Sequence, residues 1–545
     1  MLIRLKGGRV VDPTQGPSSV RDVWIRDGRV IEAPQGDEPA DVVHDVSGKV
    51  VMAGAVDVHS HIAGGNVSLA RQLLPELHVS EDPASAALPF GTARWSSWEI
   101  GRLYAEMGFT TVVEPALTPT AALHTHLELA DIPIIDRGAL TVVGNDDHFL
   151  KLLRDGESRD AIRDAIAYHL KATRGLGIKV INAGGPAAFH SGLRTFDLDD
   201  VVPHYGATSR RIVETLLTAA ADIGIPHPLH LHANNLGVPG AVDTIKATIA
   251  AAEGRPLHFA HIQFYAYGKD ADGGMTSAAE EISAAMAAAP NITADVGQVM
   301  FGPTVTISLD LMKQWSGKAY ASPKKWTIFD GDAEGGGIVP FHYKTSNWIN
   351  QLQWAIGLEL FLRSEDPARM LMTTDHPNGG LFTWYPTILA LLMDKELRDR
   401  WTAVLPEQAK ARTGLMSLER EYTLEEVATM TRSAPAKLLG LPDRGHLGPG
   451  AVADVSVYDD NPDRVAMFTG ARLVLKDGNP VVRDGKALGW AMGRTHQLSP
   501  DYDGAMDRRM TTYLTDRFGV GPSAFAVPDA AFGERENFQV EALLK

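Results

Sequence analysis

Two histidines one residue apart end the apolar run "AGAVDVHSHIAGG", which begins at Ala53. Side chains alternate across a β-strand, so Asp57, His59 and His61 are expected to share one face. Two imidazoles at the end of one strand can bind a single cation. The alternative is a pair of hydrogen-bonded core histidines, since histidine is intermediate in its preference for burial.

A lysine and an aspartate also close apolar runs. Lys179 in "GIKVIN" lies between Ile178 and Val180, where a charged ammonium is costly unless it is paired or chemically altered. A salt bridge is the plainer alternative there. Asp375 follows the apolar run of "MLMTTDHPNGG", although an aspartate before histidine and proline is also typical of a turn or cap.

Two further histidine pairs occur in similar positions. His230 and His232 in "PLHLHANN" differ by two and are expected to share a strand face. His258 and His261 in "LHFAHIQF" differ by three, so a regular strand would turn only one of them inward. Each pair alone is compatible with core packing. The histidines, the lysine and the aspartate each close a short apolar run, and their order along the chain favours one shared site.

The segments between these residues predict strand–helix alternation. Apolar runs such as "TTVVEPAL" and "NITADVGQVMF" alternate with helical patterns such as "SRRIVETLLTAAADIG", whose final glycine suits a helix stop. Serial β–α units predict a parallel (β/α)8 barrel, in which reactive groups sit at the carboxyl ends of the strands. A doubly wound sheet is the alternative, but no dinucleotide-binding glycine motif follows a strand. The glycine-rich residues 270–277 and 332–341 lack the lysine of a phosphate-binding loop and are expected to form loops.

Short alternating strands flank the predicted barrel. Residues 1–54 contain the hairpin signal "RDGRV", and a similar pattern of short alternating strands occurs again within residues 431–498. Each segment is too small to bury a core, so we expect one composite β-sandwich domain built from both ends of the chain. The barrel is expected over residues 55–430, and residues 499–545 are expected to form a C-terminal extension with one helix.

Composition excludes several classes of protein. The net charge of −16 argues against nonspecific binding to nucleic acid. Cysteine is absent, which excludes disulfides, iron–sulfur clusters and thiolate zinc sites and leaves histidine, carboxylate or modified lysine as metal ligands. We expect no signal peptide at the N-terminus, because Gly, Asp and Pro interrupt its first residues, and no apolar run approaches the ~20 residues of a membrane span. We therefore expect a soluble, cytoplasmic protein with no membrane association.

The chain resembles the amidohydrolase superfamily over nearly its whole length. "DVSGKVVMAGAVDVHSH" is similar to the family's entry into the first barrel strand, and "GHLGPGAVADVSVYD" to its return into the sandwich. The resemblance implies a distorted (β/α)8 TIM barrel, a composite β-sandwich and a centre of two Zn²⁺ or other divalent ions. It also implies the metal ligands His59, His61, Lys179 as a bridging carboxylated lysine, His232, His261 and Asp375.

This metal centre has a chemical rationale. Two close divalent ions repel, so an anion such as a lysine carbamate must bridge them. The metals would generate hydroxide and polarise a carbonyl, while Asp375 moves a proton to the leaving nitrogen. The expected reaction is hydrolysis of an amide-like C–N bond or its reverse. We expect His230 to share the inward face without binding metal, and His258 to face away from the barrel interior.

A narrower resemblance concerns the substrate. Blocks such as "HIAGGNVSLARQLLPE", "DVGQVMFGPTVTISLD" and "TTDHPNGGLFTWYP" are similar to the A-type subunits of formylmethanofuran dehydrogenase and of formyltransferase/hydrolase complexes. This resemblance implies a hydrolase subunit that interconverts an N-formyl group on a methanofuran-type C1 carrier with formate and free amine. It also implies a larger complex in which the partners are the other subunits. A hydantoinase- or dihydropyrimidinase-like hydrolase of cyclic amides is the alternative, and a catalytically inactive scaffold is a third.

Four polar residues lie just beyond the predicted ligands, where a substrate must arrive. They are Asn234, Asn235, Gln263 and His376. We expect them to contact the substrate, with hydrogen bonds that fix the loops as the alternative.

Overall fold

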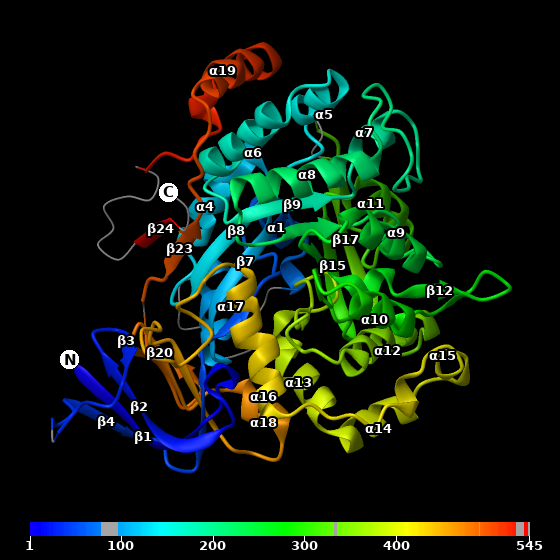
Figure 1. The fold of residues 1–545 in the computed structure, drawn as a ribbon. Helices are drawn as coiled ribbons and strands as arrows, with labels where there is room; N and C mark the ends of the chain where they lie inside the picture. The colour runs from blue at the N-terminus through cyan, green and yellow to red at the C-terminus, as the bar shows by residue number, and fades with distance from the viewer. Residues whose placement is uncertain (37, 78–95, 332–334, 490, 530–538, 543–545) are drawn as a thin grey trace.

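Two large sheets form the framework of the computed structural model (Figure 1). The structure describes residues 1–36, 38–77, 96–331, 335–489, 491–529 and 539–542. One sheet is built from parallel strands in the middle of the chain, and the other joins strands from both ends. No helix within these residues is long and apolar enough to cross a membrane.

Eight parallel strands follow one another around the barrel in chain order. They are β6 (Ala55–Asp57), β7 (Phe109–Leu117), β8 (Asp136–Val142), β9 (Gly177–Ile181), β10 (Leu229–His232), β11 (Leu257–Phe259), β14 (Ile292–Asp295) and β18 (Met370–Leu371). The first and last strands meet just beyond their ends, where Ser60 bridges to His376. The predicted (β/α)8 barrel is therefore confirmed.

Helices between the strands make the crossovers that parallel pairing requires. They include α4 (Ala122–Ala130), α6 (Arg159–Thr173), α8 (Ser209–Ile223), α9 (Val242–Ala252), α10 (Ala279–Ala288) and α12 (Trp348–Arg363). The local sequence explains where these helices begin and end. The Thr208 side chain accepts a hydrogen bond from the N–H of Arg211 to cap α8, and Gly224 ends that helix with φ at 78°.

The second sheet has nine strands, drawn from an N-terminal and a C-terminal part of the chain. The N-terminal part supplies β1 (Leu2–Val10), β2 (Ser19–Arg26), β3 (Arg29–Ile31), β4 (Val42–Asp45) and β5 (Lys49–Ala53). The C-terminal part supplies β19 (Val455–Asp459), β20 (Leu473–Lys476), β21 (Asn479–Arg483) and β22 (Lys486–Ala487). β19 pairs antiparallel with β5, with Val455 opposite Ala53. The predicted hairpin turns at Asp27 and Gly28, both with positive φ.

The C-terminal segment differs in two ways from the predicted division into a part of a β-sandwich and an extension. The pairing makes one continuous sheet, and β23 (Arg494–Gln497) leaves it to pair with β8 of the barrel. Helix α19 (Ala505–Phe518) follows and packs against α6 (Figure 1). Met506, Met510 and Leu514 are its buried residues, at the spacing of one helix face.

A small sheet inserted between β14 and β18 stands over the carboxyl end of the barrel. It contains β15 (Gly302–Ser308), β16 (Thr327–Phe329) and β17 (Gly336–Tyr343), with α11 (Leu311–Gly317) beside it. The prediction of loops is thus wrong for residues 336–341, and also for β13 (Met275–Ser277). A Cβ at Gly336 would lie 2.5 Å from the Ser308 carbonyl oxygen, so that glycine permits close strand pairing.

Candidate metal centre

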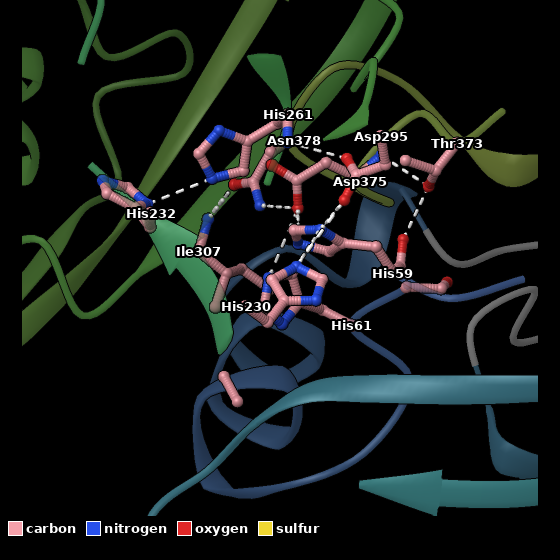
Figure 2. Close-up of polar contacts among 12 residues, drawn as sticks. His59, His61, His230, His232, His261, Asp295, Ile307, Thr373, Asp375 and Asn378 are labelled. Carbon is pink, nitrogen blue, oxygen red and sulfur yellow. Dashed lines mark hydrogen bonds and ion pairs between the residues drawn. The ribbon is translucent and has the colours of Figure 1, made fainter. Parts of the chain in front are cut away.

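One cavity of about 350 Å³ lies at the carboxyl end of the barrel. All six predicted metal ligands line it: His59, His61, Lys179, His232, His261 and Asp375. β15, β17 and α11 form another wall, to which the aromatic side chains Phe341 and Tyr343 belong. Figure 2 shows the histidine and aspartate side chains converging at and just beyond the ends of separate strands.

His59, His61 and Asp375 form the tightest group. Nε2 of His59 lies 3.0 Å from Oδ1 of Asp375, and Nε2 of His61 lies 3.4 Å from the same oxygen. One ligand atom from each residue lies within 4.8 Å of the other two. The amide of Asn378 donates to Oδ1 of Asp375 at 2.9 Å and holds the carboxylate in place. Three buried side chains in this arrangement can hold one cation.

Two further carboxylates orient the histidine rings. Nδ1 of His59 lies 2.9 Å from Asp295 (Figure 2). Nδ1 of His61 lies 2.9 Å from Glu114. A hydrogen bond at Nδ1 directs the lone pair of Nε2 toward a metal. Burial alone would lower the pKa of His61, but Glu114 and Asp375 raise it to about 9. The carboxylates thus stabilise positive charge at this point of the cavity.

Lys179 lies in the middle of β9 and is 2% exposed. Within the part of the chain that the structure describes, its Nζ has no hydrogen-bond partner. Burial lowers the pKa of Lys179 to about 8, although the carboxylates of Asp295, Asp375 and Glu114 oppose that shift. The neutral amine is the form that reacts with CO₂, so this environment fits a carboxylated lysine.

His232 and His261 form the other histidine group. Nδ1 of His232 lies 3.1 Å from Nε2 of His261, and its Nε2 lies 3.1 Å from Asp310. Burial lowers the pKa of both histidines, which keeps their rings neutral and their lone pairs available to a metal. Nδ1 of His261 has no partner among the described residues. The orphaned atoms of Lys179 and His261, with the imidazole and carboxylate donors, fit divalent metal ions.

The prediction that His258 faces away from the barrel interior is wrong. It pairs opposite His230 in the sheet, with ring centroids 4.7 Å apart, and its Nε2 lies 3.2 Å from Asp295. β11 ends at Phe259, and His261 adopts a left-handed conformation with φ at 36°. Both histidines therefore turn inward, because side chains alternate only while the strand continues.

His230 shares the inward face, as predicted, but it is not among the residues that line the cavity. Its Nε2 lies 3.3 Å from Nδ1 of His59, and its Nδ1 lies 3.1 Å from Nε2 of His227. His230, His59 and Asp295 make a second group whose ligand atoms lie within 4.8 Å of one another. That His230 binds no metal stays a prediction.

The four predicted substrate contacts are not among the described residues that line the cavity. The Asn234 amide donates to Asn182, and the Asn235 amide donates to Thr244. The Gln263 side chain accepts a hydrogen bond from the backbone N–H of Val299. The His376 ring accepts one from the backbone N–H of Phe382, and the His376 carbonyl accepts one from the backbone N–H of His61. These bonds match the alternative role of fixing loops, and a substrate contact stays a prediction.

Sequence reasoning missed four polar side chains that hold the candidate ligands. They are Glu114, Asp295, Asp310 and Asn378. Glu114 lies near the end of β7 and Asp295 ends β14, both in apolar runs already recognised as barrel strands. An acid at the carboxyl end of a barrel strand is a usable signal. Asp310 has no such signal, because it comes from the inserted segment.

Comparison with known proteins places the fold and the site in a family. The Amidohydrolase family matches residues 42–482, and the chain belongs to it. The A component of the formyltransferase/hydrolase complex Fhc of Methylorubrum extorquens is 58% identical over 539 residues, which cover 98% of each chain. Protein FwdA of Methanocaldococcus jannaschii is 37% identical over 514 residues, 90% of each chain.

A solved structure supports the same relationship. The formyltransferase/hydrolase complex FhcABCD of Methylorubrum extorquens, solved with methylofuran, contains a chain that superposes with a TM-score of 0.97. That chain is 56% identical, and the match covers 100% of both chains. A D-aminoacylase superposes at 0.51 with 15% identity over 90% of this chain and 99% of its own, which shows a shared fold alone.

Proposed function

We propose that this chain is the hydrolase subunit of a formyltransferase/hydrolase complex, acting on the formamide C–N bond of a methanofuran-type C1 carrier. The convergence of four histidines, a lysine and an aspartate in one cavity carries the proposal. The 58% identity to the A component of the Fhc complex, over 98% of the chain, supports the choice of substrate. A cyclic-amide hydrolase has weaker support, since a dihydroorotase of Citrifermentans bemidjiense is only 22% identical.

The metal-binding role falls to the residues that line the cavity. His59, His61, carboxylated Lys179, His232, His261 and Asp375 would hold two divalent ions, Zn²⁺ being the ion that this donor set suits. When bound, such ions supply an activated water and a Lewis acid for the formyl oxygen.

Asp375 is the proton carrier in this proposal. Its Oδ1 receives the hydrogen bond of Asn378 and faces the two histidines. Among the described residues, no hydrogen bond reaches its Oδ2, so that oxygen is the one that can accept a proton from water and return it to the leaving nitrogen. Asn378 keeps the carboxylate from rotating, since its own oxygen is held by the N–H of Ile307.

The rest of the cavity suits a flat apolar head group. Phe264, Phe329, Phe341 and Tyr343 line it together with aliphatic side chains. Its volume of about 350 Å³ lies at the small end of ligand pockets. A furan ring carrying a formamide is planar and small, so it can reach the metal-binding residues while a longer tail stays outside.

Formate release from an N-formylated furan carrier tests the proposal, with the protein purified together with its natural partners. The complex should release formate, and Asp375→Asn should lower turnover at least a hundredfold, as expected for loss of a general acid–base. Asp330→Asn is the matched control, because that carboxylate is 58% exposed and is not among the cavity-lining residues.

Turnover of dihydropyrimidines by the wild type without formate release would contradict the proposal and support the cyclic-amide alternative. Replacement of Asn234, Asn235, Gln263 and His376 separates their two roles. A substrate contact lowers turnover and leaves metal content intact, whereas a loop-fixing residue also lowers the unfolding temperature.

A further inference from the structure

A second cluster of metal-competent side chains lies outside the barrel, between α5 (Asp147–Arg154) and α6. Asp146 immediately precedes α5, His148 lies in its first turn, and His169 lies in α6. One ligand atom from each of the three lies within 4.8 Å of the other two. Figure 1 places these helices beside α19, and none of the three side chains is among the residues that line the barrel cavity.

Both histidines are buried and incompletely bonded. His148 is 7% exposed and His169 is 8% exposed. Nδ1 of His148 and Nε2 of His169 have no hydrogen-bond partner within the described residues. No hydrogen bond or ion pair there joins Asp146 to either histidine, although the three groups face one another. Buried polar atoms without partners are rare in native proteins, and each requires an explanation.

A purely structural role explains the cluster poorly. A buried histidine pair retained for packing normally satisfies its ring nitrogens with a carboxylate or a carbonyl. Here the Asp146 side chain caps α5 by accepting from the N–H of Phe149 and makes no bond to the histidines. Burial lowers the pKa of His148 to about 4 and also lowers that of His169. Both rings therefore present neutral lone pairs at pH 7.

We propose that Asp146, His148 and His169 bind one divalent transition-metal ion, of which Zn²⁺ fits best. Two imidazoles and one carboxylate are a common zinc donor set, and a water can complete the tetrahedron. Ligand atoms around tetrahedral zinc lie about 3.4 Å apart, so side chains whose ligand atoms already lie within 4.8 Å of one another need only a small closing movement. Asp146 is only partly buried, which leaves a route from solvent.

The surroundings are compatible with a cation. The N-terminal end of α5 and the Arg509 guanidinium both oppose a cation. The carboxylate of Asp146, which acts on His148 more strongly than Arg509 does, offsets them, whereas Asp147 is paired with Lys151 at 2.8 Å. The ring of Tyr513 from α19 covers His148 at a centroid distance of 4.8 Å, and its hydroxyl contacts Asp147 at 3.4 Å. A bound ion would thus join α5 to α6 directly beneath the C-terminal helix.

The test counts metal ions in the full chain, as purified in its complex and dialysed against buffered Zn²⁺. Wild type should bind one ion more per chain than His148→Gln or His169→Gln, while formate release is unchanged. His124→Gln, an exposed histidine on α4, is the matched control and should keep the extra ion. Zinc should raise the unfolding temperature of the wild type more than that of either variant.

Two further measurements guard against a variant that fails to fold. Asp146→Asn retains a helix cap but loses the ligand charge, and it should weaken zinc binding at this site alone. Anomalous diffraction from zinc-loaded wild-type crystals should show a peak about 2.0–2.2 Å from the three ligand atoms. A peak in the barrel cavity with none here, or equal zinc content in wild type and all three variants, would overturn the proposal. Because the readouts are ion count and position, failure of the formamide hydrolase assay would leave this inference unaffected.

Discussion

Three of the four histidines of the candidate metal centre are oriented by a carboxylate. Asp295 contacts His59, Glu114 contacts His61, and Asp310 contacts His232. An imidazole rotates freely about two bonds and exists as two tautomers, so an unsupported ring binds metal weakly. Asp295 also accepts from the His261 backbone N–H, which ties two of the histidines to one carboxylate.

Asp295→Asn should therefore weaken the metal centre. The variant keeps the size of the side chain but loses the charge that holds Nδ1 of His59, and metal affinity or turnover should fall roughly 10- to 100-fold. Thr293→Val is the control on the same strand, because Thr293 contacts His258, which is not a predicted ligand. Metal analysis after dialysis compares the metal content of the two variants. Equal metal loss in the two variants would mean that general disturbance of the barrel, and not the carboxylate, is responsible.

Lys179→Ala should remove most of the bound metal, because it deletes the only lysine among the six predicted ligands. Short-chain carboxylic acids should restore part of the metal content and activity by replacing the carbamate oxygens. Lys313→Ala is the matched control, since Lys313 lines the same cavity and is not a predicted ligand. Full metal occupancy in Lys179→Ala would contradict the bridging role.

At the scale of strands and helices, the sequence predicted most of what local chemistry determines. Apolar runs and the Gly224 stop depend on neighbouring residues, and the barrel order followed from them. The backbone conformation just beyond the strand ends, where the site residues lie, does not depend on neighbouring residues alone. Asp375 and His261 both take positive φ, and a Cβ at Gly297 would lie 2.5 Å from Cβ of His261. Such close tertiary contacts redirect side chains in a way that strand periodicity cannot reveal.

The packing of α4 against the end of α6 should make stability sensitive to acid. His126 of α4 contacts the Thr173 carbonyl at 2.8 Å, and burial lowers its pKa to about 4. The unfolded chain, with a pKa near 6.5, binds more protons between those values, so this stability is present above pH 6.5 and is lost as the pH falls toward 4. Between pH 7 and 5 the loss is about 2 kcal/mol.

His126→Gln keeps a hydrogen-bond donor without a titratable ring, so its unfolding free energy should fall less over this pH range than that of the wild type. Denaturant unfolding at pH 7 and pH 5 measures the difference. His124→Gln on the same helix is the control, since His124 is 54% exposed. Parallel curves for wild type and His126→Gln would show that His126 does not titrate in this way.

At the scale of the whole molecule, long-range pairing of β5 with β19 joins an N-terminal and a C-terminal part of the chain. The composite sheet could be predicted because neither β-rich segment can bury a core alone. The course of the C-terminal segment could not, because β23 pairs with β8 and α19 packs on α6, both far away in the sequence. Pairing partners at such separation leave no periodic signal in either segment.

The last prediction is that this chain functions only within a complex. The chain has no cysteine to bind a redox cluster, and the related chain of Methylorubrum extorquens was solved as part of FhcABCD. A carrier held between neighbouring subunits meets the second active site at a high effective concentration, whereas a free carrier is lost to dilution. Native mass measurement of the protein from its host should therefore show other subunits bound.

The alternative is a homo-oligomer whose C-terminal extension after Ser499 packs only on its own barrel. Full formamide hydrolase activity in such a homo-oligomer, with no other subunit present, would contradict the prediction.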